Sequence, residues 1–455
     1  MTKKVFSIIL AGCMAFGVMV STLFGMEGKN VGAEEAFTDK EILTPYWEGT
    51  ISYLESVLAV EEEDGSIAPI DLLYPIEEIL VVKNASLNVI YEAGKDYSTE
   101  NGKLIVHKTG SIPRMTYAEF HPTTGTNGFE DRDGGYVQWQ EGAWYHSKQI
   151  VVTYRHAEGY DGYIPESKGY LLPNTHEKLQ NDEQLNVLVY GDSISTGANS
   201  SGHPMINAAP NMPIYPEMFI RGLKRDYQKE NINLINEAVG GTDSAWGVSN
   251  VRFSVFEKYD DIDFAIIAFG MNDISVEPEN FSLNISRLVR ALKNKYDGIE
   301  IVLIATMLPN YQAINFWGKQ DQFYDVLKTQ ETEGVAVLNM TGVHKSLLEV
   351  KRYADMTGNN INHPNDYFAR VYAQSLLKTL VVDESLKGDE NEPSAGDSSG
   401  TSSDNGGNSD SSSSTTDSSE EEKGCNGSAT CGILFTLCAV AFGMKKLIDK
   451  EKNKK

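Results

Sequence analysis

The sequence predicts two folded regions: a parallel five-stranded sheet covered on both faces by helices, preceded by a small β-sandwich of jelly-roll type. Between residues 181 and 382, short apolar runs alternate with amphipathic runs, which is typical of a parallel sheet whose crossovers are helices. Between residues 37 and 178, short β-rich runs alternate with turn residues, which favours an antiparallel sandwich.

The N-terminal region contains short runs rich in β-branched residues. They predict strands at residues 79–82, 87–91, 103–107 and 149–154. Asn101-Gly102 has the composition of a two-residue hairpin turn. Trp139, Trp144 and Tyr145 follow a glycine-rich loop. These aromatic side chains either stack on sugar rings or belong to the sandwich core, and the second interpretation is favoured.

The second region alternates strand-like and helix-like periods. Strands are predicted at residues 187–190, 232–235, 264–269, 301–305 and 335–338, and helices at about 215–229, 281–295, 320–332 and 364–381. In the second of these helices, Ile285, Leu288, Val289 and Leu292 fall on one face. Functional loops of such a sheet are expected at the carboxyl ends of its strands.

The N-terminus has the pattern of an export signal over residues 1–33. Lys3 and Lys4 precede a mostly apolar run, and small residues ending at Ala33 offer a cleavage site. Two alternatives stay open: a lipoprotein signal, because residues 10–13 read Leu-Ala-Gly-Cys, and an uncleaved N-terminal anchor.

The C-terminus predicts a spacer followed by a membrane anchor. Residues 384–424 are rich in Ser, Asp, Gly and Glu and almost free of apolar side chains, so they are expected to be a disordered linker. Residues 429–446 are largely apolar and more lysines follow, as at the inner end of a membrane helix; a surface-lying amphipathic helix is the alternative. Together with the signal, this predicts an exported protein held at the outer face of a Gram-positive-like cell membrane.

Charge and cysteine content exclude several classes of function. The 455-residue chain has a formal net charge of -25, which argues against a nucleic-acid partner because phosphates would be repelled. Its four cysteines lie at positions 13, 425, 431 and 438. The body between them can therefore contain no disulfide, thiolate metal site or cysteine nucleophile.

Four short stretches follow predicted strands or precede the last helix. Gly191-Asp192-Ser193 follows the first strand, where a turn can present a serine hydroxyl. Residues 236–241 follow the second strand, Asn272 follows the third, and His363 precedes the last helix. In a parallel sheet all four reach the same rim, which would bring together a nucleophile, a base and oxyanion donors with no metal.

These stretches resemble the SGNH branch of the GDSL hydrolase family, over about residues 186–382. Residues 191–194 look like its first block, 236–241 its second, 270–273 its GxND block, and 363–364 its last. The resemblance implies a three-layer α/β/α, flavodoxin-like hydrolase domain without a cofactor. It also implies Ser193 as nucleophile and His363 as general base, with an oxyanion hole formed by the backbone N–H groups of Ser193 and Gly241 and the side chain of Asn272.

One position departs from the family pattern. The family usually has an aspartate three residues before the histidine, and this chain has Asn360. An asparagine can orient an imidazole but adds no charge to stabilise the imidazolium. We expect a Ser–His dyad whose histidine is oriented by a backbone carbonyl or by Asn360, or assistance from Asp355.

The resulting functional hypothesis is a cell-surface serine esterase that removes short acyl groups, above all acetyl, from a carbohydrate. The β-sandwich in front of the hydrolase domain is similar in order to bacterial carbohydrate O-acetylesterases, which is an analogy at the level of the fold. Two alternatives remain: a lipase or lysophospholipase, and a non-catalytic carbohydrate-binding protein. The sequence leaves the oligomeric state open.

Overall fold

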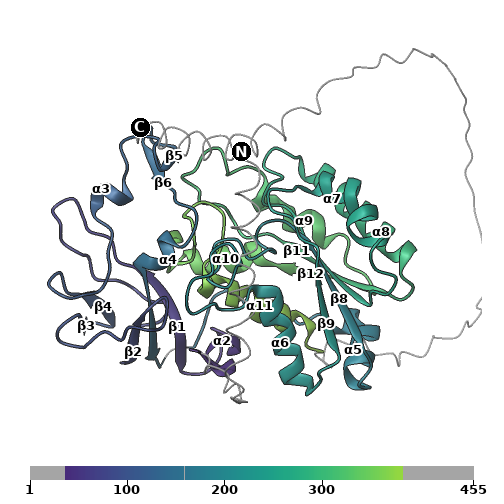
Figure 1. Ribbon diagram of the computed structural model, residues 1–455, viewed down its shortest axis with the longest axis horizontal. Coiled ribbons are helices and arrows are strands. Elements are labelled where there is room, and N and C mark those ends of the chain that lie inside the picture. Colours follow the sequence, from purple (N-terminus) through teal and green to yellow (C-terminus); the bar gives the residue numbers. More distant parts are fainter. Residues whose placement is uncertain (1–35, 158, 383–455) are drawn as a thin grey trace, which may run out of the picture. The chain divides into compact units, whose positions relative to one another are not determined.

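The computed structural model describes residues 36–157 and 159–382, which lie within one compact unit (Figure 1). A five-stranded parallel sheet forms its second half, in the order β12-β11-β10-β8-β9. The strands are β8 (Leu185–Gly191), β9 (Ile232–Asn236), β10 (Phe264–Ala268), β11 (Glu300–Ala305) and β12 (Val335–Asn339). Each overlaps a predicted strand, because long apolar runs in this region leave little choice but a sheet buried on both faces.

Helices cover both faces of this sheet, so the predicted three-layer α/β/α fold is confirmed. One layer contains α7 (Ser244–Val251), the π-helical turn η2 (Arg252–Phe256), α8 (Pro278–Lys295) and α9 (Phe323–Lys328). The other contains α6 (Tyr215–Tyr227), α10 (Met340–Leu348) and α11 (Asp366–Leu380), while α5 (Pro173–Gln180) leads into β8. Neighbouring strand residues point to opposite layers: Val187 and Val189 pack toward α6 and α11, and Leu188 and Tyr190 toward α7 and α8.

The helix boundaries differ from the predictions where polar residues intervene. Helix α11 begins at Asp366 with Asn365 as its N-cap, so Pro364 lies before the helix and not in its first turn. The run 320–332 divides into η3 (Gln320–Gln322) and the short α9. Helix α7 was not predicted, because its sequence, SAWGVSNV, is only eight residues long and does not separate apolar and polar residues clearly onto two faces.

The N-terminal region consists of antiparallel strands, as the sequence predicts. Strands β1 (Ile51–Leu58), β7 (Gln149–Arg155) and β2 (Glu78–Asn84) form a three-stranded sheet, and β3 (Tyr97–Glu100) with β4 (Lys103–Val106) and β5 (Gly128–Glu130) with β6 (Tyr136–Gln138) form hairpins. Short helices α2 (Asp39–Leu43), α3 (Tyr117–Phe120) and α4 (Trp144–Lys148) accompany them, and single-turn helices η1 (Gly169–Leu171) and η4 (Tyr353–Asp355) lie farther along the chain. Asn101 and Gly102 have φ of 51° and 75°, as a type I′ hairpin turn requires.

One predicted N-terminal strand is absent. Residues 87–91 form only an isolated bridge, in which Ile90 pairs with Lys83. Leu87 has φ of 58°, and the Asn84 side chain accepts hydrogen bonds from the backbone N–H groups of Asn88 (3.1 Å) and Val89 (3.0 Å). The chain therefore turns here, because asparagine offers the backbone a local partner in place of a neighbouring strand.

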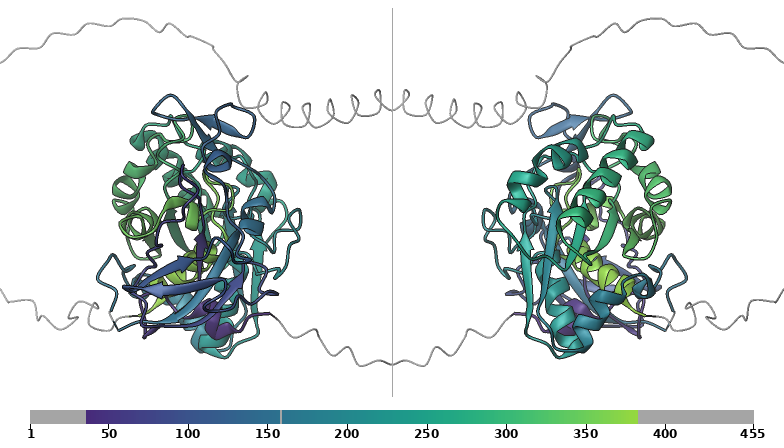
Figure 2. Two further views of the ribbon diagram at one scale, coloured as in Figure 1. Left: turned by 90° about the vertical axis from the view of Figure 1, so that its left-hand side faces the viewer. Right: turned by 90° about the vertical axis from the view of Figure 1, so that its right-hand side faces the viewer.

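The N-terminal region packs against the layer that contains α10 and α11 (Figure 2). A single hydrophobic cluster contains residues of β1 and β7 as well as residues of α6, α11 and the parallel sheet. A fully buried ion pair crosses this interface: Lys351 Nζ lies 2.5 Å from Glu55 Oε1. Arg370 of α11 also donates to the carbonyl oxygens of Tyr53 (2.9 Å) and Leu54 (3.1 Å). A continuous core thus joins the region to the sheet, while the boundary proposed at residues 178–181 stays a prediction.

Three predicted segments lie outside the described residues: the signal peptide at 1–33, the linker at 384–424 and the anchor at 429–446. Within the described part of the chain, no helix combines the length and hydrophobicity that a bilayer crossing needs.

Candidate active site

Ser193 lies just beyond the end of β8, where the strand order of the sheet reverses. Strands β9 and β10 flank β8 on its two sides, so the loops after these three strands meet at one rim. Such a switch point is the usual ligand site of an open α/β sheet. Gly191 allows the close approach of β10, because a Cβ atom there would lie 2.5 Å from the carbonyl oxygen of Ala268.

Buried polar side chains connect the three loops of this rim. Asp192 accepts hydrogen bonds from the backbone N–H groups of Ile194 (3.0 Å) and Met271 (3.4 Å), which ties the β8 loop to the β10 loop. Asp273 accepts from the backbone N–H of Ser244 (3.1 Å), which ties the β10 loop to α7. Burial raises the pKa of Asp192 to about 7 and that of Asp273 to about 6. Both aspartates therefore connect neighbouring loops of the rim.

His363 lies in the loop just before α11, which we call the histidine loop, and this loop reaches the same rim as Ser193. His363 Nε2 lies 2.9 Å from Ser193 Oγ. Ser193 is buried with 7% of its surface exposed, and the His363 side chain is 12% exposed. Burial lowers the pKa of His363, and the neighbouring His203 lowers it further, whereas the negative charge of Glu141 opposes these effects. A neutral imidazole next to a serine hydroxyl is the arrangement that a general base requires.

Two asparagines surround the other ring nitrogen of His363. Asn199 Oδ1 lies 2.6 Å from Nδ1, and its amide is oriented by donation from Nδ2 to the carbonyl oxygen of Gly142 (3.2 Å). Asn359 Nδ2 lies 3.0 Å from Nδ1, but it also donates to Glu141 Oε1 and Asn362 Oδ1, each at 3.1 Å. We therefore assign the proton to Nδ1, which donates it to Asn199 and leaves Nε2 free to accept from Ser193.

The histidine loop has a tightly ordered backbone. Asn359 Oδ1 accepts hydrogen bonds from the backbone N–H groups of Ile361, Asn362 and His363, at 3.0, 3.1 and 3.2 Å. Gly358 permits the contact with the loop that carries Ser193 and Asn199, because a Cβ atom there would lie 2.5 Å from the Cβ of Asn199. Hydrogen bonds to the Asn359 side chain thus stabilise the turn that carries His363, and this turn packs closely against the loop that carries Asn199.

The predicted oxyanion donors lie on the neighbouring loops. A Cβ atom at Gly240 would lie 3.8 Å from the Cβ of Ser193, and one at Gly241 would have no neighbour within 4 Å. Asn272 donates from Nδ2 to the carbonyl oxygen of Thr242 at 2.9 Å. The glycines after β9 therefore lie next to Ser193, and Asn272 is joined to the same loop through Thr242.

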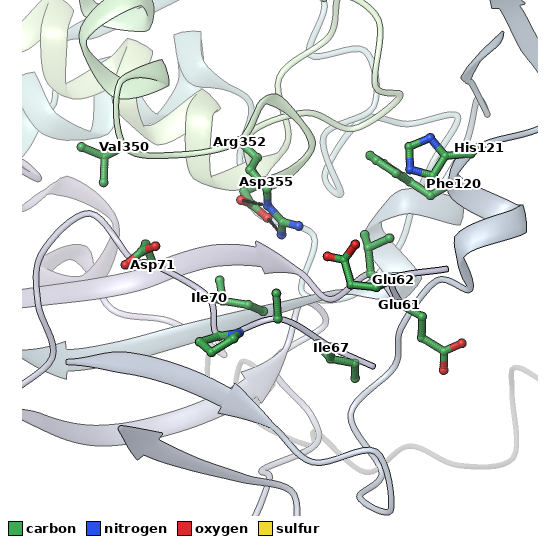
Figure 3. A pocket seen from close by; sticks show the side chains of 13 residues that line it. Glu61, Glu62, Ile67, Ile70, Asp71, Phe120, His121, Val350, Arg352 and Asp355 are labelled. Atoms are coloured by element: carbon green, nitrogen blue, oxygen red, sulfur yellow. Dashed lines mark hydrogen bonds and ion pairs between the residues drawn. The ribbon is translucent and has the colours of Figure 1, made fainter. Parts of the chain in front are cut away.

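Neither residue that we expected to orient the histidine contacts it. The Asn360 side chain points toward the N-terminal region and donates to the carbonyl oxygen of Gln138 at 3.1 Å. Asp355 pairs with Arg352 and accepts from the backbone N–H of Leu58 at 2.7 Å. It lines a separate cavity of about 260 Å³, in which Figure 3 shows it against Arg352. We also expected a backbone carbonyl oxygen to orient His363, but the oxygen that contacts His363 Nδ1 belongs to the Asn199 side chain.

Sequence reasoning missed three side chains near His363: Asn199, Asn359 and Glu141. Asn199 belongs to a polar loop with no periodic pattern, and Glu141 lies more than 200 positions earlier in the chain. Asn359 was detectable in principle, because an asparagine pair occupies positions 359–360 just before His363. Among the described residues, no group of three or more His, Cys, Asp or Glu side chains is arranged to hold a metal ion.

The predicted aromatic residues have partners within the protein. Tyr145 is fully buried and packs against Trp144 with ring centroids 5.2 Å apart. Trp139 is partly buried and contacts Phe129, also at 5.2 Å. The interpretation of these residues as core or edge residues of the β-rich region fits these contacts.

Comparison with known proteins gives one family match. Residues 189–371 match the model of the GDSL-like Lipase/Acylhydrolase family. No curated protein matches the chain. Similar solved structures include a two-domain esterase (CEX) active on acetylated mannans, with 21% identity and a TM-score of 0.37 over 51% of this chain and 58% of that one. This chain thus spans little more than half of that esterase.

A second similar structure is the acetyl xylan esterase AlAXEase, with 16% identity and a TM-score of 0.34 over 42% of this chain and 98% of that one. Another is Axe2, an acetylxylan esterase from Geobacillus stearothermophilus, with 16% identity and a TM-score of 0.36 over 44% of this chain and 95% of that one. The family match covers all four stretches that meet at the rim. Residues 189–371 therefore form a hydrolase domain that belongs to the GDSL-like lipase/acylhydrolase family.

Proposed function

We propose that the protein is a serine esterase that hydrolyses short acyl esters, above all acetyl esters, on a carbohydrate. The observation that carries the proposal is the 2.9 Å contact between Ser193 Oγ and His363 Nε2 at the switch point of the sheet. The assigned tautomer of His363 leaves Nε2 ready to accept the serine proton.

The proposed reaction has two halves. Ser193 Oγ attacks the ester carbonyl carbon while its proton passes to His363 Nε2, and the backbone N–H groups of Ser193 and Gly241 with Asn272 Nδ2 stabilise the oxyanion. The imidazolium then gives the proton to the departing sugar oxygen, which leaves an acyl-enzyme. Water attacks this acyl-enzyme ester while His363 takes its proton; the imidazolium then gives that proton to the departing Ser193 Oγ, and the carboxylic acid is released.

A carbohydrate substrate is supported by a polar cavity in the β-rich region, apart from Ser193 and His363. A cavity of about 340 Å³ lies in the β-rich region, beside the segment that contacts the histidine loop. Its lining includes Trp144 together with Thr124, Thr126, Asn127, Gln138 and Gln140. Amide and hydroxyl side chains beside an aromatic ring suit the hydroxyl groups and apolar face of a sugar, whereas a long acyl chain needs an apolar groove.

The proposed location is the outer face of the cell membrane. It is supported by the signal-like residues 1–33 and the apolar, lysine-flanked residues 429–446. The hydrolase domain would then act on extracellular material within reach of the spacer. Protease accessibility on intact cells would test this, since a protein retained inside would resist digestion.

The deciding experiment compares the full-length protein with its Ser193→Ala variant. We expect hydrolysis of 4-nitrophenyl acetate and release of acetate from acetylated xylan or mannan, and a loss of about 10³-fold or more in the variant. Ser249→Ala, on an exposed position of α7, is the matched control and should retain full activity.

Other outcomes would favour the alternatives. Activity that rises with acyl chain length would favour a lipase or lysophospholipase. Binding to a polysaccharide without ester hydrolysis that depends on Ser193 would favour a non-catalytic carbohydrate-binding protein.

A further inference from the structure

We propose that Glu141, a residue of the β-rich N-terminal region, is a positioning residue whose carboxylate supplies the charge that stabilises the protonated His363. The inference rests on the proposed Ser193–His363 hydrolysis and deepens it. Glu141 would give the N-terminal region a part in catalysis. Its carboxylate would supply the negative charge that the family's usual aspartate provides, because Asn360 occupies the position of that aspartate here.

The need for such a charge follows from the partners of His363. Its Nδ1 proton is donated to Asn199 Oδ1, a neutral acceptor. A neutral amide orients the ring, but it stabilises an imidazolium less than a carboxylate does. Since His363 becomes positively charged in the proposed transition state, a nearby negative charge would lower the barrier.

Glu141 lies where this charge is useful. Its Oε1 is 4.0 Å from His363 Nδ1. The same oxygen accepts hydrogen bonds from Asn359 Nδ2 (3.1 Å) and Trp139 Nε1 (3.3 Å). Its side chain is 48% exposed, so solvent screens the attraction, and we expect a moderate effect.

Contacts between the two regions keep Glu141 in place. Asn360 holds the segment by donating to the carbonyl oxygen of Gln138 (3.1 Å). Trp139 packs in a cluster that includes Phe129 and Phe316, and Ile361 of the histidine loop belongs to the same cluster. The departure from the family pattern at position 360 thus coincides with a side chain that anchors the segment bearing Glu141.

Two charged or titratable groups face the His363 imidazole. Burial has the largest effect on its pKa and lowers it; Glu141 raises the pKa by attraction, and His203, on the loop after Ser193, lowers it by repulsion. Removing the charge of Glu141 should therefore lower the pKa of His363. The imidazolium of the transition state should lose the same stabilisation.

The test uses Glu141→Gln in the full-length protein, because glutamine keeps an oxygen that can accept from Asn359 and Trp139. We expect the acid limb of kcat/KM to move to lower pH by a few tenths of a unit up to about one unit. The plateau of kcat should fall by about twofold to tenfold, because the imidazolium loses its attraction to the Glu141 carboxylate. KM should change little. Glu130→Gln, an equal charge change at an exposed residue of β5, should leave both unchanged.

Three outcomes would overturn the inference. One is a Glu141→Gln enzyme with the wild-type pH profile and kcat. A second is an unchanged profile in Glu141→Gln together with a slow Glu141→Ala enzyme, since Glu141 would then act only through its hydrogen bonds. A third is a change confined to KM, which would make Glu141 a substrate contact.

A direct titration separates this inference from the proposed function. The pKa of His363 can be followed by NMR in Ser193→Ala, with and without Glu141→Gln. A lower pKa in the double variant supports the inference even if the wild-type protein hydrolyses no ester, which would refute the proposed function alone. Equal pKa values would refute the role of Glu141 whatever the enzymatic activity.

Discussion

Two regions of the chain meet at His363, and they differ in how their sequences relate to their structures. The rim of the parallel sheet is built from short stretches at strand ends, and their spacing along the chain indicates where they meet. The segment 138–141 belongs to the β-rich region, and its sequence has no motif that links it to the rim. Its proximity to the histidine loop depends on Gln138, Trp139 and Glu141, each of which has a partner in that loop or beside it. Local motifs thus identify the proposed reacting groups, whereas tertiary packing determines their electrostatic environment.

The largest expected effect concerns the interface that joins the two regions. Glu55→Ala should lower the free energy of unfolding by about 3–5 kcal/mol, because it leaves the buried ammonium of Lys351 without its partner. Chemical denaturation followed by tryptophan fluorescence measures this change. Glu48→Ala, at an exposed position, is the control and should change stability little. Equal stability of the two variants would mean that the interface contributes little to folding.

The next largest effect concerns the rim itself. Asn272→Ala should lower kcat by about 10²–10³-fold with little change in KM, because one oxyanion donor is lost. Steady-state kinetics with an acetyl ester gives both values. A rise in KM at constant kcat would instead place Asn272 in ground-state binding and would remove it from the proposed oxyanion hole.

A smaller effect should separate the two asparagines near His363. Asn199→Ala should lower kcat by about tenfold, because the Nδ1–H group loses the acceptor that orients the ring. Asn360→Ala should act only indirectly, through the segment that carries Glu141, and should have the weaker effect. If Asn360→Ala proved the more damaging of the two for kcat, the family position would matter more than the contact seen in the structure.

The smallest effect is a displacement on the pH axis. Burial lowers the pKa of His363 from its ordinary value near 6.5. The base must be unprotonated, so kcat/KM should remain high as the pH falls to 6.5 and should reach half its plateau below that value. An acid limb of kcat/KM centred above pH 7 would contradict this account, in which burial lowers the pKa of His363 more than the charge of Glu141 raises it.

Much of the fold was predictable because the strands of the parallel sheet are continuous apolar runs, such as Val187 to Tyr190, that only a doubly covered sheet can bury. The failures have local causes. Leu87 adopts a left-handed conformation beside an asparagine-stabilised turn, and helix α7 is too short and too weakly amphipathic to show a helical period.

The candidate site was predictable only in part. Ser193, Gly241, Asn272 and His363 lie in recognisable stretches, and the structure brings them to one rim. The surroundings of Nδ1 were not predictable, because they depend on which side chain reaches His363 and not on sequence spacing. Asn360 has the expected position in the sequence, but its side chain turns toward Gln138.

Covalent labelling tests the central claim most directly. An activity-based fluorophosphonate reacts with an activated serine, and peptide mass spectrometry identifies the residue modified. We predict one label per chain, on Ser193, and its loss in both Ser193→Ala and His363→Ala, because the hydroxyl needs its base. Labelling of another serine, or of Ser193 at an undiminished rate in His363→Ala, would contradict a Ser193–His363 active site.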